Sequence, residues 1–272
     1  MIDPGIEGRV AIVTGGNHGI GAATVRALAA QGVKVFITYL RLVEEAEDAV
    51  VPDTYSRNRA QAADAIVAEI REKDGQAEAW EGDLGDPAAI PQLFDRTESQ
   101  LGPVDILIHN AAAWMADTFL SESTDRLGRR LNPLSAASHD LHFAVNSRAT
   151  ALLIAEFAHR FRERGAAWGR IITVTTGGSG GFPEEVSYGA SKNALESYTM
   201  AAAWELGQFG ITANVVCPPA TDTGWIPEAS REEIAQGSPL RRICTPNQVA
   251  DVILFLVSQQ AAAVTADKIV MR

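Results

Sequence analysis

The chain has 272 residues, of which 46% are hydrophobic and 21% are charged, so a disordered chain is excluded and a well-buried core is expected. Its 34 acidic and 23 basic residues give a formal net charge of −11, which argues against nucleic acid as a partner. No apolar stretch reaches the roughly 18–20 residues that span a bilayer, so we expect a cytoplasmic protein without a membrane partner. Two cysteines and five histidines without an HExxH pair give no reason to expect a metal site.

A strand, a glycine-rich turn and a helix open the chain. Residues 9–14 form a β-branched apolar run that stops at Gly15, a helical pattern follows from about Gly19 to Gln31, and residues 33–39 form a second apolar run. A helical crossover returns the chain to the edge of the sheet where it began, so the two strands are expected to be parallel. The sequence therefore begins with a βαβ unit.

The same alternation of strands and helices continues to the end of the chain. Further strands are expected near residues 77–81, 104–109, 170–176, 211–217 and 268–271, and helices near 60–73, 87–101, 141–163, 187–208 and 246–258. This order predicts the α/β class: a single Rossmann-type, doubly wound parallel sheet of about seven strands, flanked by helices on both faces.

Two stretches break the alternation and are interpreted as loop insertions in one domain that covers residues 1–272. They lie near residues 42–58 and 114–138, after strands, which is where an open α/β sheet places its ligands. The alternative for residues 42–58 is a solvated surface loop.

The turn after the first strand has the features of a dinucleotide site. Glycines there let the backbone approach a pyrophosphate, and the helix N-terminus offers it free amides and a positive dipole. The spacing G-x-x-x-G-x-G resembles that of the short-chain dehydrogenase/reductase family, whose members are dinucleotide-binding catalytic domains. The resemblance implies cofactor contacts from Gly15, Asn17, His18, Gly19, Ile20 and Gly21.

The end of the second strand bears on the choice of nicotinamide cofactor. No carboxylate stands there to bind a free ribose 2′-hydroxyl; Tyr39 and Arg41 offer a hydroxyl and a guanidinium instead, and His18 adds a basic residue type in the turn. We therefore expect NADP(H) rather than NAD(H), although Arg41 has acidic neighbours, Glu44 and Glu45, with which it could pair.

Two further sites near the strand ends resemble cofactor contacts of the family. Asp83 and Leu84, after the third strand, resemble the pair that holds the adenine; the alternative for Asp83 is a turn residue. Asn110 and Ala111 resemble the motif that closes over the cofactor after the fourth strand, whereas we interpret the preceding His109 as structural.

A tyrosine and a lysine follow the strand at 170–176 at a spacing that serves proton transfer. Tyr188 and Lys192 are four residues apart, hence one turn apart on one helix face, and a nearby ammonium stabilises a phenolate whose pKa is ordinarily about 10. By the resemblance, Tyr188 is the general acid of carbonyl reduction, and Lys192 binds the nicotinamide ribose and lowers the pKa of the tyrosine.

The family also uses a serine and an asparagine, and the chain departs from the first. Counting from the start of the strand puts Thr176 in the place of the serine, whereas counting back from the tyrosine gives Thr175; we favour Thr176, with Ser179 as a further substitute. Asn146 resembles the asparagine whose helix kink holds a water that links the lysine to solvent.

The loop after the sixth long strand resembles the family's nicotinamide-binding segment. Pro218, Thr221 and Thr223 are its expected cofactor contacts, and Pro219 replaces a glycine, which stiffens the loop and removes an amide.

The resemblance implies an NAD(P)(H)-dependent oxidoreductase that interconverts a ketone and a secondary alcohol, most like bacterial 3-oxoacyl-[acyl-carrier-protein] reductases. Its substrate is then a small molecule or an acyl thioester, and Arg126, Arg129 and Arg130 are either a landing patch for an acidic carrier or a solvated face. A homodimer or homotetramer built on the helices near 141–163 and 187–208 is implied as well. The alternative is a catalytically inactive, NADP(H)-binding sensor.

Overall fold

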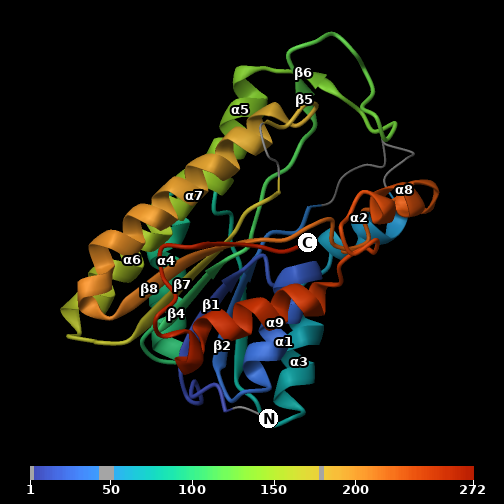
Figure 1. The fold of residues 1–272 in the computed structure, drawn as a ribbon. Helices are drawn as coiled ribbons and strands as arrows, with labels where there is room; N and C mark the ends of the chain where they lie inside the picture. Colours follow the sequence, from blue (N-terminus) through green and yellow to red (C-terminus); the bar gives the residue numbers. More distant parts are fainter. Residues whose placement is uncertain (1–2, 43–51, 178–180) are drawn as a thin grey trace.

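A computed structural model describes residues 3–42, 52–177 and 181–272 of the chain. Its main feature is a seven-stranded sheet in the order β3-β2-β1-β4-β7-β8-β9, in which every neighbouring pair is parallel (Figure 1). The strands are β1 (Val10–Thr14), β2 (Lys34–Tyr39), β3 (Ala77–Glu81), β4 (Ile106–His109), β7 (Gly169–Val174), β8 (Ile211–Cys217) and β9 (Lys268–Val270). The predicted fold class is confirmed.

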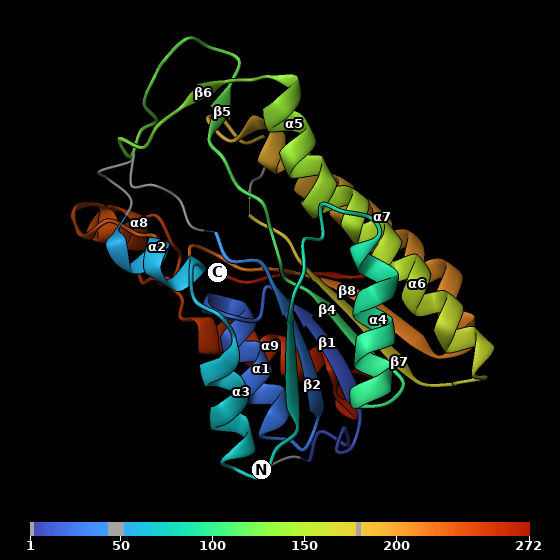
Figure 2. The same cartoon turned by 180° about the vertical axis from the view of Figure 1, so that it is seen from behind.

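Two layers of helices cover the sheet, and alternate strand residues face each layer because side chains alternate along a strand. Ala11 and Val13 of β1 belong to the core beneath one layer, whereas Val10 and Ile12 belong to the core beneath the other. Figures 1 and 2 show the two layers from opposite sides. The first layer holds α1 (Gly19–Ala29), α3 (Asp64–Arg71) and α9 (Pro246–Val257), and the second holds α4 (Ala89–Gln100), α6 (Ala149–Glu163) and α7 (Val186–Leu206).

The two insertions contain short elements that hydrophobic periodicity does not reveal. In the first, the sequence of α2 (Asp53–Arg59) has no apolar stripe, and the helix accordingly buries none of its residues. In the second, β5 (Asp117–Thr118) and β6 (Asn132–Pro133) form a separate parallel pair. A further short helix, α8 (Arg231–Gln236), lies beside α2 in both cartoon views and also buries no residue.

Some predicted boundaries are wrong by several residues. The helix expected at 60–73 is limited to α3, and the helix expected at 141–163 begins earlier, as α5 (Ala136–His142), and continues through a π-helical stretch (Phe143–Arg148) into α6. Ser135 starts α5 with a capping box, a signal that the apolar period does not contain. Short 3₁₀ turns at Gly207–Phe209, Glu228–Ser230 and Gln259–Ala261 complete the described elements. None of the described helices has both the length and the apolar character needed to cross a membrane.

Parallel pairing brings the carboxyl ends of the strands to one edge of the sheet, and this edge determines where the site residues meet. Thr14 at the end of β1 lies beside His109 at the end of β4, and His109 lies beside Thr173 of β7. The loops that follow these strands therefore converge, as expected for a ligand site in an open α/β sheet.

Candidate active site

The turn between β1 and α1 leaves room for a diphosphate against the backbone. Gly15 and Gly19 have φ angles of +64° and +55°, in the left-handed region that favours glycine. A Cβ on Gly21 would stand 2.0 Å from the carbonyl oxygen of Gly15, so no other residue fits. The N-cap residue, His18, makes no side-chain cap, which leaves the first amides of α1 available for an anion.

A buried hydrogen-bond network fixes this turn to the end of β4. The hydroxyl of Thr14 accepts hydrogen bonds from the backbone amides of Asn110 (3.1 Å) and Ala111 (3.0 Å), and it lies 2.9 Å from Nδ1 of His109. The amide side chain of Asn110 donates to the carbonyls of Thr14 and Gly15, both at 3.1 Å. Burial, with the nearby Lys192 as a second cause, lowers the pKa of His109 to about 3, so this imidazole is neutral.

At the end of β2, the guanidinium expected to bind a phosphate already has a carboxylate partner. Arg41 NH2 lies 2.7 Å from Oε2 of Glu81, and its Nε donates to both oxygens of that carboxylate at 2.9 and 3.0 Å. Tyr39 pairs with Glu81 in the sheet register, which explains why the acid reaches Arg41. The acids considered as partners in the sequence, Glu44 and Glu45, lie outside the described residues.

His18 differs from the expectation of a basic residue in the turn. Burial and the Arg59 cation lower the pKa of His18 to about 4, so its ring is uncharged at neutral pH. Its ring makes an edge contact with Tyr55 of α2, with 6.2 Å between the centroids. Asn17, the preceding residue, donates to the carbonyl of Gln61 at 2.9 Å. The segment after β2 therefore packs on the glycine turn.

The predicted adenine-binding pair has mixed surroundings. Leu84 is buried, whereas Asp83 is exposed and accepts a hydrogen bond from the backbone amide of Gly85 at 2.7 Å. The Asp83 carboxylate therefore forms a local turn, as the alternative interpretation had it.

Tyr188 lies on the first turn of α7, half-buried between two rings. The rings are Phe182 and His142, with centroids 6.4 and 6.1 Å from that of the phenol. Burial raises the pKa of the Tyr188 phenol well above its usual value, and the charges of Glu185 and Tyr55 raise it further, whereas a hydrogen bond with the side chain of Thr176 lowers it.

Of the two threonines considered as the serine substitute, Thr176 is the one whose side chain acts on the pKa of the phenol. Thr175 is buried, and its hydroxyl donates to Oε1 of Glu196 at 2.7 Å, a carboxylate that also binds the Lys268 ammonium at 2.7 Å. Ser179, the third option, lies outside the described residues. The structure therefore brings Thr176 to Tyr188 and turns Thr175 away.

The ammonium of Lys192 lies one helical turn beyond Tyr188 and is 2% exposed as a residue. Its Nζ donates to the carbonyl of Val174, the last residue of β7, at 2.9 Å, and lies 5.9 Å from the centroid of the Tyr188 ring. Burial lowers the pKa of Lys192 to about 7, and the Glu196 carboxylate opposes this change. The amine therefore changes charge in the physiological range.

Asn146 lies in the π-helical stretch between α5 and α6 and is fully buried. Its side chain forms a pair of 2.9 Å hydrogen bonds with the backbone of Ala113, and its Nδ2 also donates to Ser191 at 3.0 Å. These bonds join the strand-end loop after β4 to α7, directly before Lys192. Single-turn π segments often accompany functional sites because they break the regular helical bonding.

The loop after β8 reaches over the glycine turn. A Cβ on Gly19 would stand 2.9 Å from the methyl group of Thr223, so this threonine packs on the turn. Thr221 is buried and donates its hydroxyl to Pro219 at 2.8 Å, and its carbonyl accepts the indole N–H of Trp225 at 2.9 Å. Pro218 begins the loop directly after β8.

Sequence reasoning missed a cluster beside Tyr188 and misjudged one arginine. Glu185 accepts hydrogen bonds from the indole N–H of Trp114 (3.0 Å) and from the Arg129 guanidinium (3.1 Å). Arg129 is buried, so for this residue both interpretations, a landing patch and a solvated face, are wrong. These contacts join residues 56 and 71 positions apart, and no local sequence pattern signals them.

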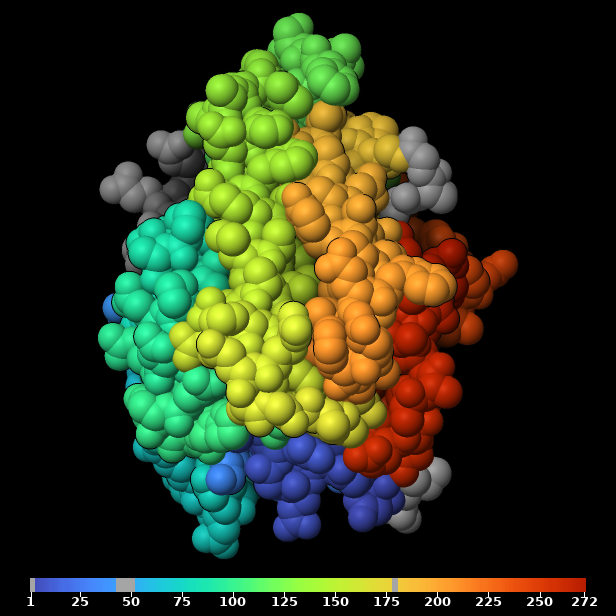
Figure 3. Space-filling model, turned by 90° about the vertical axis from the view of Figure 1, so that its left-hand side faces the viewer, coloured from blue at the N-terminus to red at the C-terminus, as the bar shows by residue number. Residues whose placement is uncertain are grey.

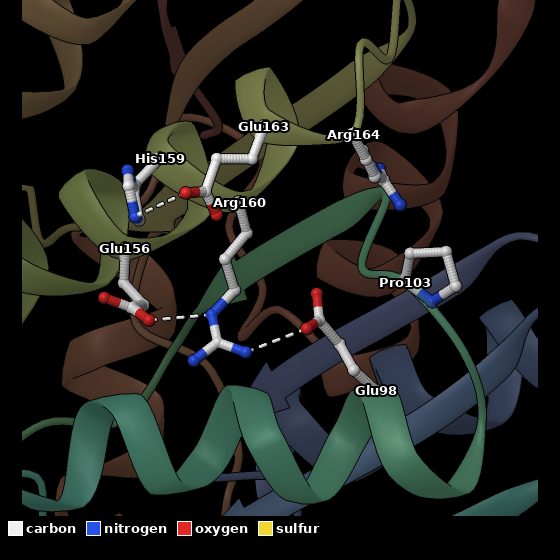
Figure 4. A pocket seen from close by; sticks show the side chains of 7 residues that line it. All are labelled: Glu98, Pro103, Glu156, His159, Arg160, Glu163 and Arg164. Atoms are coloured by element: carbon white, nitrogen blue, oxygen red, sulfur yellow. Dashed lines mark hydrogen bonds and ion pairs between the residues drawn. The ribbon is translucent and has the colours of Figure 1, made fainter.

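A surface groove of about 590 Å³ lies away from this site, between α4 and α6 (Figure 4). Its lining includes Pro103, before β4, and Arg164, at the end of α6, so it belongs to the edge of the sheet where strands begin. Arg160 of α6 bridges the two helices there by binding Glu98 of α4 at 2.8 Å, and it also binds Glu156 of its own helix at 2.7 Å. We assign this ionic cluster to helix packing.

No group of three or more metal-ligating side chains is present among the residues that the structure describes. The glycine cradle and the open amides of α1, by contrast, fit the diphosphate of a dinucleotide.

Comparisons with known proteins agree with this geometry. Residues 45–271 match the family model described as enoyl-(acyl carrier protein) reductase, and residues 9–52 match that of the short chain dehydrogenases. The uncharacterized oxidoreductase YjdA of Bacillus subtilis is 33% identical over 94% of this chain and 92% of its own length. A 3-oxoacyl-[acyl-carrier-protein] reductase of Synechocystis is 30% identical over 95% and 92%.

Solved structures show the same architecture. A dehydrogenase/reductase from Sinorhizobium meliloti superimposes with a TM-score of 0.81 at 30% identity, covering 99% of this chain and 95% of its own. A short-chain dehydrogenase from Burkholderia cenocepacia in complex with NADP has a TM-score of 0.80 at 28% identity, covering 98% and 97%.

Proposed function

The chain belongs to the short-chain dehydrogenase/reductase family, which makes it an oxidoreductase with a nicotinamide cofactor, and from this premise we propose that it interconverts a ketone and a secondary alcohol with NADP(H). The observation that carries the proposal is the group of three side chains near the carboxyl end of β7: Tyr188, Thr176, whose side chain acts to lower the pKa of the phenol, and Lys192 one turn away. We treat residues 1–272 as one catalytic domain.

The proposed roles follow from the donors and acceptors of these side chains. When bound, NADPH supplies the hydride that reduces the carbonyl carbon. Tyr188 donates its phenolic proton to the carbonyl oxygen, and Thr176 donates a hydrogen bond to the same oxygen as negative charge develops on it. Lys192 stabilises the phenolate that remains, and it is held in place by the carbonyl of Val174.

The remaining candidate residues hold the cofactor or support the ones that do. Residues of the glycine turn bind the diphosphate through backbone amides. Asn110 and Ala111 fix that turn, and Asn146 fixes the segment before Lys192. Thr221 and Thr223 would hold the nicotinamide end, a role supported by the packing of Thr223 on Gly19 of the glycine turn.

The preference for NADP(H) rests on Arg41 and on the absence of an acid at the end of β2 itself. A guanidinium recognises a phosphate better than a ribose hydroxyl, which supports the phosphorylated cofactor. Glu81 opposes it, because its carboxylate occupies the guanidinium and repels a 2′-phosphate. Arg41 must exchange Glu81 for the phosphate when NADPH binds.

The substrate is proposed to be a free ketone or alcohol or a 3-oxoacyl thioester. A thioester is supported by the reductases of acyl carrier protein substrates among the relatives. Because Arg129 is buried, Arg126 and Arg130 are the exposed arginines of the second insertion, and two cations make a weaker docking site for an acidic carrier than three.

A homodimer or homotetramer is proposed through α6 and α7, which lie side by side on the face shown in Figure 3. Trp204 of α7 is 82% exposed and Leu152 of α6 is 37% exposed. Apolar side chains of this size on adjacent helices suit a second copy of the chain. Light scattering on the protein and on Trp204→Glu measures the mass of each, and a monomeric wild type contradicts this assembly.

The central experiment mixes the protein with NADPH and a panel of β-keto esters and cyclic ketones and follows the loss of NADPH absorbance. We expect turnover that falls about 100-fold or more in Tyr188→Phe while NADPH binding is kept. Tyr198→Phe, ten residues further along α7 and exposed, is the matched control and keeps its activity. Cofactor binding without turnover across the panel would instead favour a sensor.

A further inference from the structure

Arg129 is a buried cation that belongs to the second insertion and lies beside the catalytic helix. Its side chain is 11% exposed. The guanidinium lies 4.5 Å from the centroid of the Trp114 ring and 5.9 Å from that of Trp225, in the loop after β8. Two aromatic rings around a guanidinium favour the cation and limit its motion.

Two carboxylates bind this cation, although one would neutralise it. Asp125 Oδ2 lies 2.6 Å from Nε of Arg129, and Asp125 Oδ1 accepts the backbone amide of Arg129 at 2.8 Å. The second carboxylate is Glu185, at 3.1 Å, which also accepts the indole N–H of Trp114. Since Asp125 already satisfies the charge, the contact with Glu185 needs a separate explanation.

Glu185 stands at the start of α7, three residues before Tyr188. The side chain of Glu185 accepts no backbone N–H of its own helix, so it makes no N-terminal cap. The second insertion instead supplies the cap, because Asp117 of β5 accepts the backbone amide of Ser187 at 2.9 Å. The insertion therefore holds the first turn of α7, which carries Tyr188, at two points: Asp117 binds Ser187 and Arg129 binds Glu185.

We propose that Arg129 is a positioning residue for Tyr188: it holds Glu185 against Trp114, fixes the first turn of α7, and neutralises the carboxylate that lies closest in sequence to the phenol. This role rests on the proposed function, because it assumes that Tyr188 transfers the proton. Through Trp225, the same guanidinium joins the insertion to the loop over the cofactor turn.

The direction of the electrostatic effect follows from the charges. The negative charge of Glu185 opposes ionisation of Tyr188 and raises its pKa. A cation bound to Glu185 reduces that opposition. Other ionisable groups near the phenol stay in place in the variants below: Lys192 of α7, His142 of α5 and Tyr55 of α2. Asp117 of β5 also stays, bound to the amide of Ser187.

The test compares Arg129→Met, Glu185→Gln and the double variant in the oxidation of ethyl 3-hydroxybutyrate by NADP⁺ as a function of pH. Oxidation requires the phenolate, so kcat/KM rises as Tyr188 loses its proton. We expect Arg129→Met to move this rise upward by about one pH unit, Glu185→Gln to move it downward, and the double variant to follow Glu185→Gln. The KM for NADP⁺ changes less than about twofold.

Glu122→Gln, a charge loss on the exposed part of the same insertion, is the control and leaves the profile unchanged. A uniform loss of activity in Arg129→Met at every pH, or a double variant as impaired as Arg129→Met alone, overturns the proposal and leaves a packing role. If Arg129→Met fails to fold, Glu185→Gln alone decides, because an unshifted profile overturns the proposal.

A second readout separates this inference from the proposed function. Ultraviolet titration of tyrosinate in the NADP⁺ complex, with the signal of Tyr188→Phe subtracted, follows the phenol without any turnover. If no substrate is oxidised, the proposed function fails, while an upward shift in Arg129→Met and a downward shift in Glu185→Gln still support the inference. Identical titrations in all variants contradict it.

Discussion

The side chain of Thr176 opposes the rise in the pKa of the Tyr188 phenol. Thr175, its neighbour in sequence, points to the other side, where its hydroxyl donates to Glu196 at 2.7 Å. Successive residues of an extended segment face opposite ways, so only one of the two hydroxyls can reach the site. Both threonines follow β7 directly, and the alternation that begins in the strand decides between them.

Replacing Thr176 with valine keeps its shape and removes the hydroxyl. We expect kcat to fall about 10- to 100-fold, because the carbonyl oxygen loses a donor as charge develops on it, while the KM for the cofactor stays within about twofold. Steady-state kinetics on a ketone that the wild type reduces measure both quantities.

The matched variants are Thr175→Val and Thr176→Ser. Thr175→Val leaves kcat within about threefold but lowers stability by about 1–2 kcal/mol, because Glu196 loses a donor in a half-buried setting. Thr176→Ser, unlike Thr176→Val, retains the hydroxyl and should therefore keep most of the wild-type activity. If Thr175→Val is the more damaging of the two valine substitutions for kcat, the assignment of Thr176 is wrong.

Glu81→Gln tests the competition between a carboxylate and a 2′-phosphate for Arg41. Removing the charge frees the guanidinium and removes a repulsion, so we expect the KM for NADPH to fall about three- to tenfold while the KM for NADH stays unchanged. Arg41→Ala has the opposite effect on NADPH. Initial rates with each cofactor measure these values, and an equal change for NADPH and NADH contradicts the placement of the phosphate at Arg41.

The glycine turn and the tyrosine–lysine pair could be predicted from the sequence because all the residues of each motif lie in one short segment. The glycine turn joins a strand to a helix between Val10 and Ala29, with the three motif glycines between them and at the start of the helix, and the tyrosine and lysine need only one helical turn. The sheet itself follows from apolar runs at strand length, and the order of its strands confirms the doubly wound class.

The parts that the sequence does not reveal depend on contacts between distant segments. Arg41 meets Glu81 across 40 positions, and Arg129 meets Glu185 across 56. Burial gives His18 a neutral ring, although its residue type indicates a base. Periodicity describes which face of an element is apolar, but it says nothing of which charge an insertion brings to a neighbouring helix.

Gly21→Ala tests whether the glycine turn is as tight as the geometry indicates. The added Cβ would meet the carbonyl oxygen of Gly15 at 2.0 Å, so the backbone must shift, and we expect a loss of at least about 2 kcal/mol in the free energy of unfolding, with no measurable NADPH binding. Gly207→Ala is the control: its Cβ meets no atom within 4 Å, and its φ of −55° is helical. It should stabilise the protein by about 0.4–1 kcal/mol. Urea denaturation of both variants measures the difference, and equal effects contradict the steric argument.

The buried ammonium of Lys192 gives the cofactor-free protein a pH-dependent stability. Its pKa is about 7 in the folded chain against 10.5 for an unperturbed lysine. Between these values the unfolded chain holds a proton that the folded chain has lost, so the free energy of unfolding rises with pH across this window. The slope contributed by this one group approaches 1.4 kcal/mol per pH unit.

The window from about pH 7.5 to 8.5 isolates this effect from the other shifted groups. The pKa values of His18 and His109 are lowered, so these groups change the unfolding free energy only below the ordinary histidine pKa. Those of Cys217 and Tyr188 are raised from 9 and 10, so these groups change it only above pH 9 and pH 10. We therefore expect the unfolding free energy of the wild type, measured by urea denaturation without cofactor, to rise by about 1 kcal/mol over this window relative to Lys192→Met, which has no proton to exchange there. Parallel profiles for the two proteins would mean that Lys192 keeps an ordinary pKa, and its place as the group that stabilises the phenolate would then rest on a permanently charged ammonium.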